Sequence, residues 1–337
     1  MKKIFAITVI ISLLFSCNNS NKIPDVSAIK INLSTERFER NLFDTSAVSL
    51  PIYIRHLQTD NPAFTNTFLT KILNVDPQWP ADTAATYVNG FIKAYRLLYQ
   101  DVEKKFPDFS TYENEIKFAL QLVKYYFPNY KTPEKIITYI GPPDGFGDIL
   151  APEGLLVGLH HHLGRDYPLY KTEMVQQFYP EYISRQFEPE YITINAIKNI
   201  TTDIYPEKND DQPLINQMIE KGKRLFLLQK FLPKTAEYKL IGYTADQFKD
   251  CNAHEAVIWD MFIKNNLLQS IDKNMMKNYV DEGPTTQELG AGSPGNIGSF
   301  AGWQIVKKYM QKNAAITLQQ LINTDAETVF REAKYKP

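Results

Sequence analysis

The sequence predicts a single, mostly helical α+β domain with a small sheet. Apolar residues recur at helical spacing in several long segments, and two short apolar runs bounded by turn residues predict strands. No internal repeat, low-complexity block or clear linker divides the 337 residues. The 44% hydrophobic and 13% aromatic content supplies a substantial core. The net charge of -1 argues against nucleic-acid binding, which usually requires a basic excess.

The first 16 residues are predicted to be a secretory signal peptide. Lys2 and Lys3 precede the apolar stretch 4–15, whose twelve residues would rise only about 18 Å as a helix and could not cross a bilayer. Ser16-Cys17 then resembles the lipobox of bacterial lipoproteins, although Phe15 is bulkier than usual there. That resemblance implies lipidation of Cys17, a tether over 17–27 and a globular domain over 28–337. An ordinary signal peptide with an incidental cysteine is the alternative.

Cysteine usage agrees with a lipid anchor. The chain has two cysteines, Cys17 and Cys251, so lipidation of the first leaves the second without a disulfide partner. Stability must then come from packing of the core. We interpret Cys251 as a buried, inert thiol.

The first half of the domain mixes predicted strands and helices. Alternation of Ile29, Ile31 and Leu33 predicts a strand, followed by a short helical face around 38–43. A long helix is expected over 82–105, and Ser110 with Glu113 predicts a capping box that opens the next helix. The apolar runs 136–140 and 155–159 are predicted to pair in a small sheet.

Helices dominate the second half. They are expected near 190–200, over 213–231, over 244–268 and over 294–311, followed by two short terminal helices. Three of these helices have predicted capping boxes at their starts, formed by Thr244 with Gln247, Thr317 with Gln320 and Thr324 with Glu327.

The strongest enzymatic candidate is His254-Glu255, which resembles the start of a zinc-peptidase helix motif. Such a motif needs a second histidine four residues after the first, so that both imidazoles reach one ion. Ile258 occupies that position and cannot bind a metal. The motif is therefore incomplete.

His160 and His162 are two residues apart after a predicted strand and would project from the same face. Two ligands are too few for a structural zinc site, although Asp166 or a remote glutamate could complete one. The alternative is a strand end whose imidazoles make only structural hydrogen bonds.

The glycines near the C-terminus belong to no phosphate-binding or nucleophile motif, and we interpret them as sites where helices pack closely. The segment 290–295 lacks the Lys-Ser/Thr of a phosphate loop, and no Gly-x-Ser-x-Gly motif is present. Gly298 and Gly302 fall on one helical face beside Trp303. We expect a close helix approach inside the core at this point.

Several of these stretches together resemble the gliding motility lipoproteins of the GldB type from Bacteroidetes. The resemblance spans nearly the whole mature chain and is most specific in Ser293-Pro294-Gly295-Asn296-Ile297-Gly298 and in Gly302-Trp303-Gln304-Ile305-Val306. It implies an outer-membrane lipoprotein, facing the periplasm, that is needed for gliding and for the linked secretion apparatus. Its expected partners are the membrane, through acyl chains on Cys17, and envelope proteins of that apparatus.

This family in turn resembles predicted zinc peptidases of the gluzincin type. In those proteins a His-Glu-x-x-His helix precedes a helix with an acidic third ligand, but here 189–200 contains no histidine. Glu220 stands where the acidic ligand is expected. The resemblance implies a degenerate peptidase fold that holds no cofactor and binds a protein partner. The alternative is a divergent metal-dependent hydrolase that uses some of His160, His162, Glu220 and His254.

Overall fold

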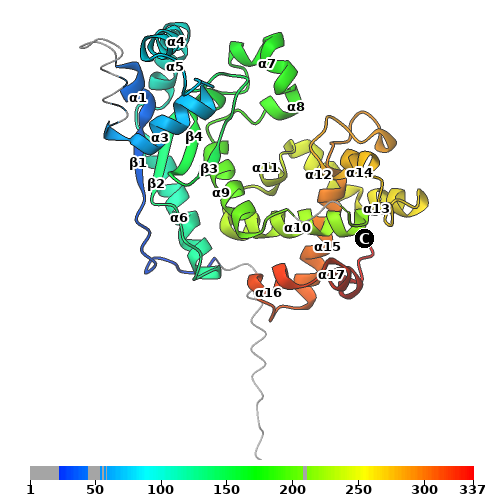
Figure 1. The fold of residues 1–337 in the computed structure, drawn as a ribbon. Helices are drawn as coiled ribbons and strands as arrows, with labels where there is room; N and C mark the ends of the chain where they lie inside the picture. Colours follow the sequence, from blue (N-terminus) through cyan, green and yellow to red (C-terminus); the bar gives the residue numbers. More distant parts are fainter. Residues whose placement is uncertain (1–22, 45–53, 55–56, 58, 208–210) are drawn as a thin grey trace, which may run out of the picture.

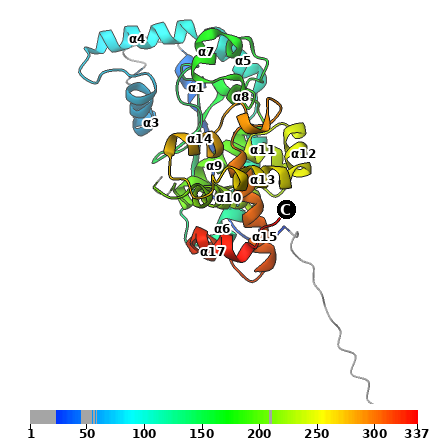
Figure 2. The same cartoon turned by 90° about the vertical axis from the view of Figure 1, so that its right-hand side faces the viewer.

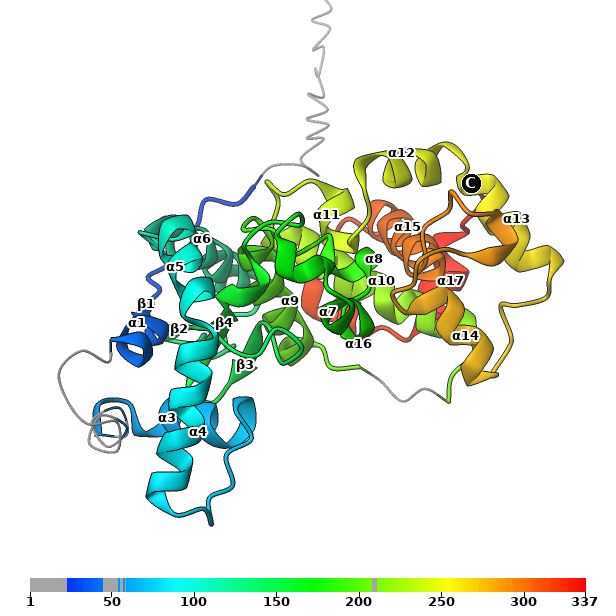
Figure 3. The same ribbon diagram turned by 90° about the horizontal axis from the view of Figure 1, so that it is seen from above.

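The computed structural model describes residues 23–44, 54, 57, 59–207 and 211–337. A four-stranded sheet stands at one end of the molecule and the C-terminal helices at the other, with α9 and α10 between them (Figures 1 and 3). The apolar side chains of both ends belong to one continuous core. The predicted fold class, a helix-rich α+β domain with a small sheet, is confirmed.

The sheet has the strand order β1-β2-β4-β3. Its strands are β1 (Ser34–Arg37), β2 (Lys135–Tyr139), β3 (Ile149–Ala151) and β4 (Gly154–Gly158). β2 pairs in parallel with both β1 and β4, whereas β3 is antiparallel to β4. The predicted pairing of the two apolar runs is therefore correct. Because their strands are parallel, the C-terminal ends of β2 and β4 lie at the same edge of the sheet.

Helices make up most of the remaining structure. Those of the first half are α1 (Phe38–Phe43), α3 (Pro62–Thr67), α4 (Ala81–Ala94), α5 (Arg96–Lys105), α6 (Ser110–Tyr126), α7 (Glu173–Phe178) and α8 (Glu181–Ser184), with a π-helical turn at Phe68–Ile72. Figure 2 shows α4 lying across one end of the molecule. Those of the second half are α9 (Tyr191–Ile204), α10 (Leu214–Phe231), α11 (Glu237–Ile241), α12 (Ala245–Ala253), α13 (Glu255–Lys264), α14 (Lys273–Val280), α15 (Ile297–Lys312), α16 (Leu318–Asn323) and α17 (Ala326–Ala333). In this described part of the chain, no helix has the length and apolarity needed to span a bilayer.

Three predicted elements were wrong. The strand expected at Ile29–Leu33 is absent, and β1 begins only at Ser34. The helix expected over 82–105 is interrupted at Tyr95, which has a φ of -101° and a ψ of 14° and separates α4 from α5. The helix expected over 244–268 is likewise interrupted at His254, between α12 and α13.

Two of the four predicted capping boxes are confirmed. Thr244 with Gln247 and Thr317 with Gln320 each make both reciprocal hydrogen bonds. At α6 the Ser110 amide donates instead to Asp108, and Glu113 accepts from the Thr35 hydroxyl. At α17 the capping residue is Asp325, one position after the predicted Thr324.

The second half is organised around the contact of α10 with α15. A Cβ built on Gly302 would lie 1.8 Å from the backbone oxygen of Met218, and one built on Gly222 would lie 2.4 Å from the backbone of Gly302. These distances are too short for any side chain, so the two helix backbones touch directly. Trp303, next to this contact, is fully buried.

Gly302→Ala should destabilise the protein by about 2 kcal/mol or more, because the new methyl group must push α15 away from α10. The measurement is the urea midpoint of unfolding, followed by tryptophan fluorescence.

Gly90→Ala is the matched control. Gly90 lies in the interior of α4 with no atom within 4 Å of its added Cβ. This variant should gain roughly 0.5–1 kcal/mol from the better helix propensity of alanine. Equal midpoints for Gly302→Ala and the wild type would show that the two helices do not touch at this glycine.

Candidate functional site

Three consecutive histidines, His160, His161 and His162, follow β4 and include two of the four candidate metal ligands. β4 ends at Gly158, and the chain then turns through a 3-10 helix at Leu159–His161. His160 and His162 therefore leave a helical turn just after the strand, and the prediction that they project from one strand face is wrong. All three side chains are buried. They lie where the C-terminal ends of β2 and β4 meet the loop over 141–148.

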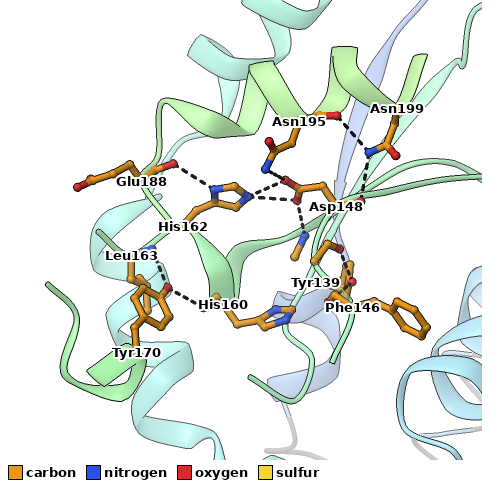
Figure 4. Close-up of polar contacts among 12 residues, drawn as sticks. Tyr139, Phe146, Asp148, His160, His162, Leu163, Tyr170, Glu188, Asn195 and Asn199 are labelled. Atoms are coloured by element: carbon orange, nitrogen blue, oxygen red, sulfur yellow. Dashed lines mark hydrogen bonds and ion pairs between the residues drawn. The ribbon is translucent and has the colours of Figure 1, made fainter. Parts of the chain in front are cut away.

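His162 is held between a carboxylate and a carbonyl (Figure 4). Its Nε2 lies 2.9 Å from Asp148 Oδ2 and its Nδ1 lies 3.1 Å from the backbone oxygen of Glu188. Both ring nitrogens therefore lie within hydrogen-bond distance of a protein oxygen. Neither nitrogen is left free to bind a metal.

Asp148 was not predicted as a site residue, yet it is the centre of this cluster. Its carboxylate accepts from the Gly158 amide at 3.1 Å and from Asn195 Nδ2 at 2.9 Å, in addition to His162. Its backbone oxygen accepts from Asn199 Nδ2 at 3.1 Å. Asp148 thus joins the turn after β4 to two successive turns of α9, as Figure 4 shows. Such a saturated carboxylate has a structural role.

His160 points into the gap between the ends of β2 and β4. Its Nδ1 accepts from the Gly141 amide at 3.1 Å, and its backbone oxygen accepts from the Tyr170 hydroxyl at 2.6 Å. Full burial, with His161 and His162 adding smaller effects, places the pKa of His160 well below its usual value. The ring is therefore neutral, with its proton on Nε2, which has no hydrogen-bond partner among the described residues.

His161 packs as an aromatic residue. Its ring stacks on Phe187 with centroids 4.3 Å apart and planes at 10°, and its Nε2 lies 2.9 Å from the Pro143 oxygen. Burial lowers the pKa of His161 to about 4, although the Pro143 carbonyl opposes the shift. His161 is neutral at pH 7 and donates to Pro143.

Glu220 belongs to a different buried cluster in α10. Its carboxylate accepts from Lys223 Nζ at 2.9 Å and from the Tyr205 hydroxyl. Lys223, which is fully buried, also donates to the Thr324 oxygen at 2.6 Å. The carboxylate expected to bind a metal is thus neutralised by a lysine, and the cluster links α10 to the ends of α9 and α16.

His254 lies at the junction of α12 and α13. Its Nδ1 is 2.9 Å from the Asp250 oxygen in an exposed setting, and Glu255 accepts from the Tyr335 hydroxyl at 2.6 Å. Ile258, in the position of the missing second histidine, is buried in the core. Nearby Cys251 is free and buried, and burial raises the pKa of its thiol to about 12.

The four candidate metal ligands do not form one site. His160 and His162 share one cluster with separate partners, Glu220 is paired with Lys223, and His254 lies at an exposed helix junction. Within the described ranges, no group of three or more His, Cys, Asp or Glu is placed to hold a metal ion. The residues present therefore do not fit a peptidase zinc.

His161→Phe should flatten the acid limb of the pH–stability curve. A histidine whose folded pKa lies near 4, below its unfolded value of about 6.5, binds fewer protons folded than unfolded between these values, so stability falls as the pH drops. The variant keeps the stack on Phe187 and should remove up to about 1.4 kcal/mol per pH unit of slope.

Urea unfolding at several pH values between 7 and 4 measures this slope. Loss of the donor to Pro143 lowers stability equally at every pH, so only the slope is diagnostic. Parallel curves for wild type and variant would contradict the assignment of a neutral, buried His161.

The comparisons with known proteins agree with the resemblance seen in the sequence. A family model described as gliding motility protein GldB matches residues 19–337, nearly the whole chain. Searches of curated proteins and of solved structures each returned no significant match. The prediction of the family from its motifs is confirmed, and the chain belongs to the GldB family of gliding motility proteins.

Proposed function

We propose that this protein is a lipid-anchored, non-enzymatic envelope protein that supports gliding motility and its associated secretion machinery by binding protein partners. The observation that carries the proposal is the family match over 19–337, which begins two residues after the lipobox cysteine. Cys17 itself lies outside the described residues. We place the protein in the outer membrane, facing the periplasm, because that is what the resemblance implies.

The chemistry of the interior supports a non-enzymatic role. Catalysis by an activated zinc water needs an ion, a base and an open coordination position. His162, Asp148 and Glu220, which would serve such a reaction, are already paired with buried protein groups. The geometry of the candidate ligands lends no support to the alternative of a metal-dependent hydrolase.

The distant similarity to gluzincin peptidases belongs to the same proposal. α9 and α10 stand in the order of the two ligand-bearing helices of such enzymes, and α10 carries Glu220 at the place of the acidic ligand. In this chain α9 carries Asn195 and Asn199 toward Asp148, and both act as hydrogen-bond donors. A peptidase-like arrangement adapted to binding accounts for both the order of the two helices and the asparagines on α9.

Cys17→Ser should abolish gliding when it is the only copy in the native host, because a serine hydroxyl cannot receive the thioether-linked lipid. The measurement is colony spreading of a gene-deletion strain complemented with each variant, with protein levels followed by immunoblot.

Cys251→Ala is the matched control, since it removes the other, buried cysteine. This strain should spread as the wild type does. Full spreading by the Cys17→Ser strain, with the protein released from membranes, would disprove the anchored role. Full spreading by the deletion strain would disprove the link to motility.

A further inference from the structure

The described chain begins on one face of the molecule, beside the end of α6 (Figures 1 and 3). Gln121 on α6 donates from its Nε2 to the Ile29 oxygen at 2.7 Å, so the first described segment packs along this helix. The Nζ of Lys234, in the loop after α10, lies 4.8 Å from the centre of the Phe118 ring on α6. We call the surface formed by 23–33, 117–134 and 232–236 the anchor face.

The proposed lipid anchor keeps this face close to a bilayer. Five residues, 18–22, separate Cys17 from Ile23, and a stretch of this length spans at most about 21 Å. A compact domain of this size has a radius of gyration of about 19 Å, so its opposite surfaces are about 50 Å apart. In Figures 1 and 3, α4 lies far from the point where the coloured chain begins. The anchor face can therefore rest on the bilayer, whereas α4 cannot reach it.

The anchor face has an excess of positive charge, although the whole chain has a net charge of -1. A neighbouring acid, Asp203, accepts from the Tyr130 hydroxyl at 2.7 Å, and α16, which borders the face, carries no charged residue. The charged residues of the face itself are five lysines and two acids, namely Lys30, Lys117, Lys124, Lys131, Lys234, Asp25 and Glu134. Each lysine close to an anionic lipid surface strengthens association about fivefold.

An exposed aromatic side chain stands among these lysines. Tyr125, in the last turn of α6, is 49% exposed, and its ring lies edge-on to Tyr126. The adjacent Lys124 donates to the Pro128 oxygen at 2.6 Å and to the Tyr130 oxygen at 3.0 Å, which holds the loop after α6 in place. Tyrosine favours the boundary between lipid headgroups and acyl chains, because its ring is apolar and its hydroxyl is polar.

We propose that the anchor face rests on the bilayer and binds the headgroups of anionic phospholipids. Its lysines lie at the level of the lipid phosphates, and Tyr125 reaches the boundary with the acyl chains. This contact holds the anchored body in one orientation, with α4 turned away from the membrane. The inference rests on the proposed lipid anchoring and adds the surface that meets the lipid.

The test uses the acylated full-length protein in vesicles of equal parts phosphatidylglycerol and phosphatidylcholine brominated in the upper part of its acyl chains. Bromine quenches a tryptophan only at close range, so quenching reports contact with the bilayer. Tyr125→Trp should be quenched clearly more than the wild type, whose own three tryptophans supply the background. Tryptophan suits this position because it favours the same interface as tyrosine.

Tyr87→Trp is the matched control. Tyr87 lies on α4 and is 46% exposed, close to the 49% of Tyr125. Quenching of this variant should equal that of the wild type, because its new tryptophan is held away from the lipid.

A second pair of variants, made in the Tyr125→Trp protein, tests the charge. Lys131→Glu/Lys234→Glu should lower the ratio of docked to undocked protein at least about tenfold. Lys71→Glu/Lys93→Glu makes the same charge change at exposed lysines outside the anchor face and should leave this ratio unchanged. Replacing phosphatidylglycerol with neutral phosphatidylcholine should act as the first variant does.

Equal quenching of Tyr125→Trp and Tyr87→Trp would overturn the proposal, and so would equal effects of the two lysine pairs. Flotation of the vesicles on a sucrose gradient separates this failure from that of the proposed function, because the acyl chains alone hold an undocked protein on the vesicles. Protein that does not float with the vesicles would contradict lipid anchoring and this inference with it.

Discussion

The direct backbone contact between α10 and α15 is the constraint on which the second half of the fold depends. α10 also packs against α6, α9, α11, α14, α16 and α17, so its position determines where these helices lie. Glycines at 222 and 302 let the two backbones meet without intervening side chains. The same contact fixes the start of α15, and with it Asn296, the residue at which the helix begins.

Around this frame, the chain uses its ionisable residues to join elements that lie far apart in sequence. Asp148 and His162 tie the end of the sheet to α9, and Glu220 with Lys223 ties α10 to the end of α16. Breaking a buried pair of this kind costs about 3–5 kcal/mol, because the remaining charge is left unpaired. Residues committed in this way are poorly suited to catalysis, which needs groups free to exchange protons or ligands.

The sequence revealed elements with strong local signals and missed those set by tertiary contacts. The apolar runs of β2 and β4 and the capping boxes of α12 and α16 are local and were predicted correctly. β1 was missed because Ser34–Arg37 is polar and becomes a strand only by pairing with β2. The helix breaks at Tyr95 and His254 were missed because no glycine or proline stands at either position. The histidine run was visible, but Asp148 was not, because no spacing rule links an aspartate to a histidine 14 residues later.

The central claim is that the interior holds its acids and histidines in structural pairs and does not use them to bind a catalytic ion. Measuring the metal content of the purified full-length protein, after incubation with zinc and gel filtration, tests this most directly. The account predicts well below one zinc per chain, with no change for a His160→Ala/His162→Ala variant. One zinc per chain, removed by a chelator and lost in that variant, would contradict it.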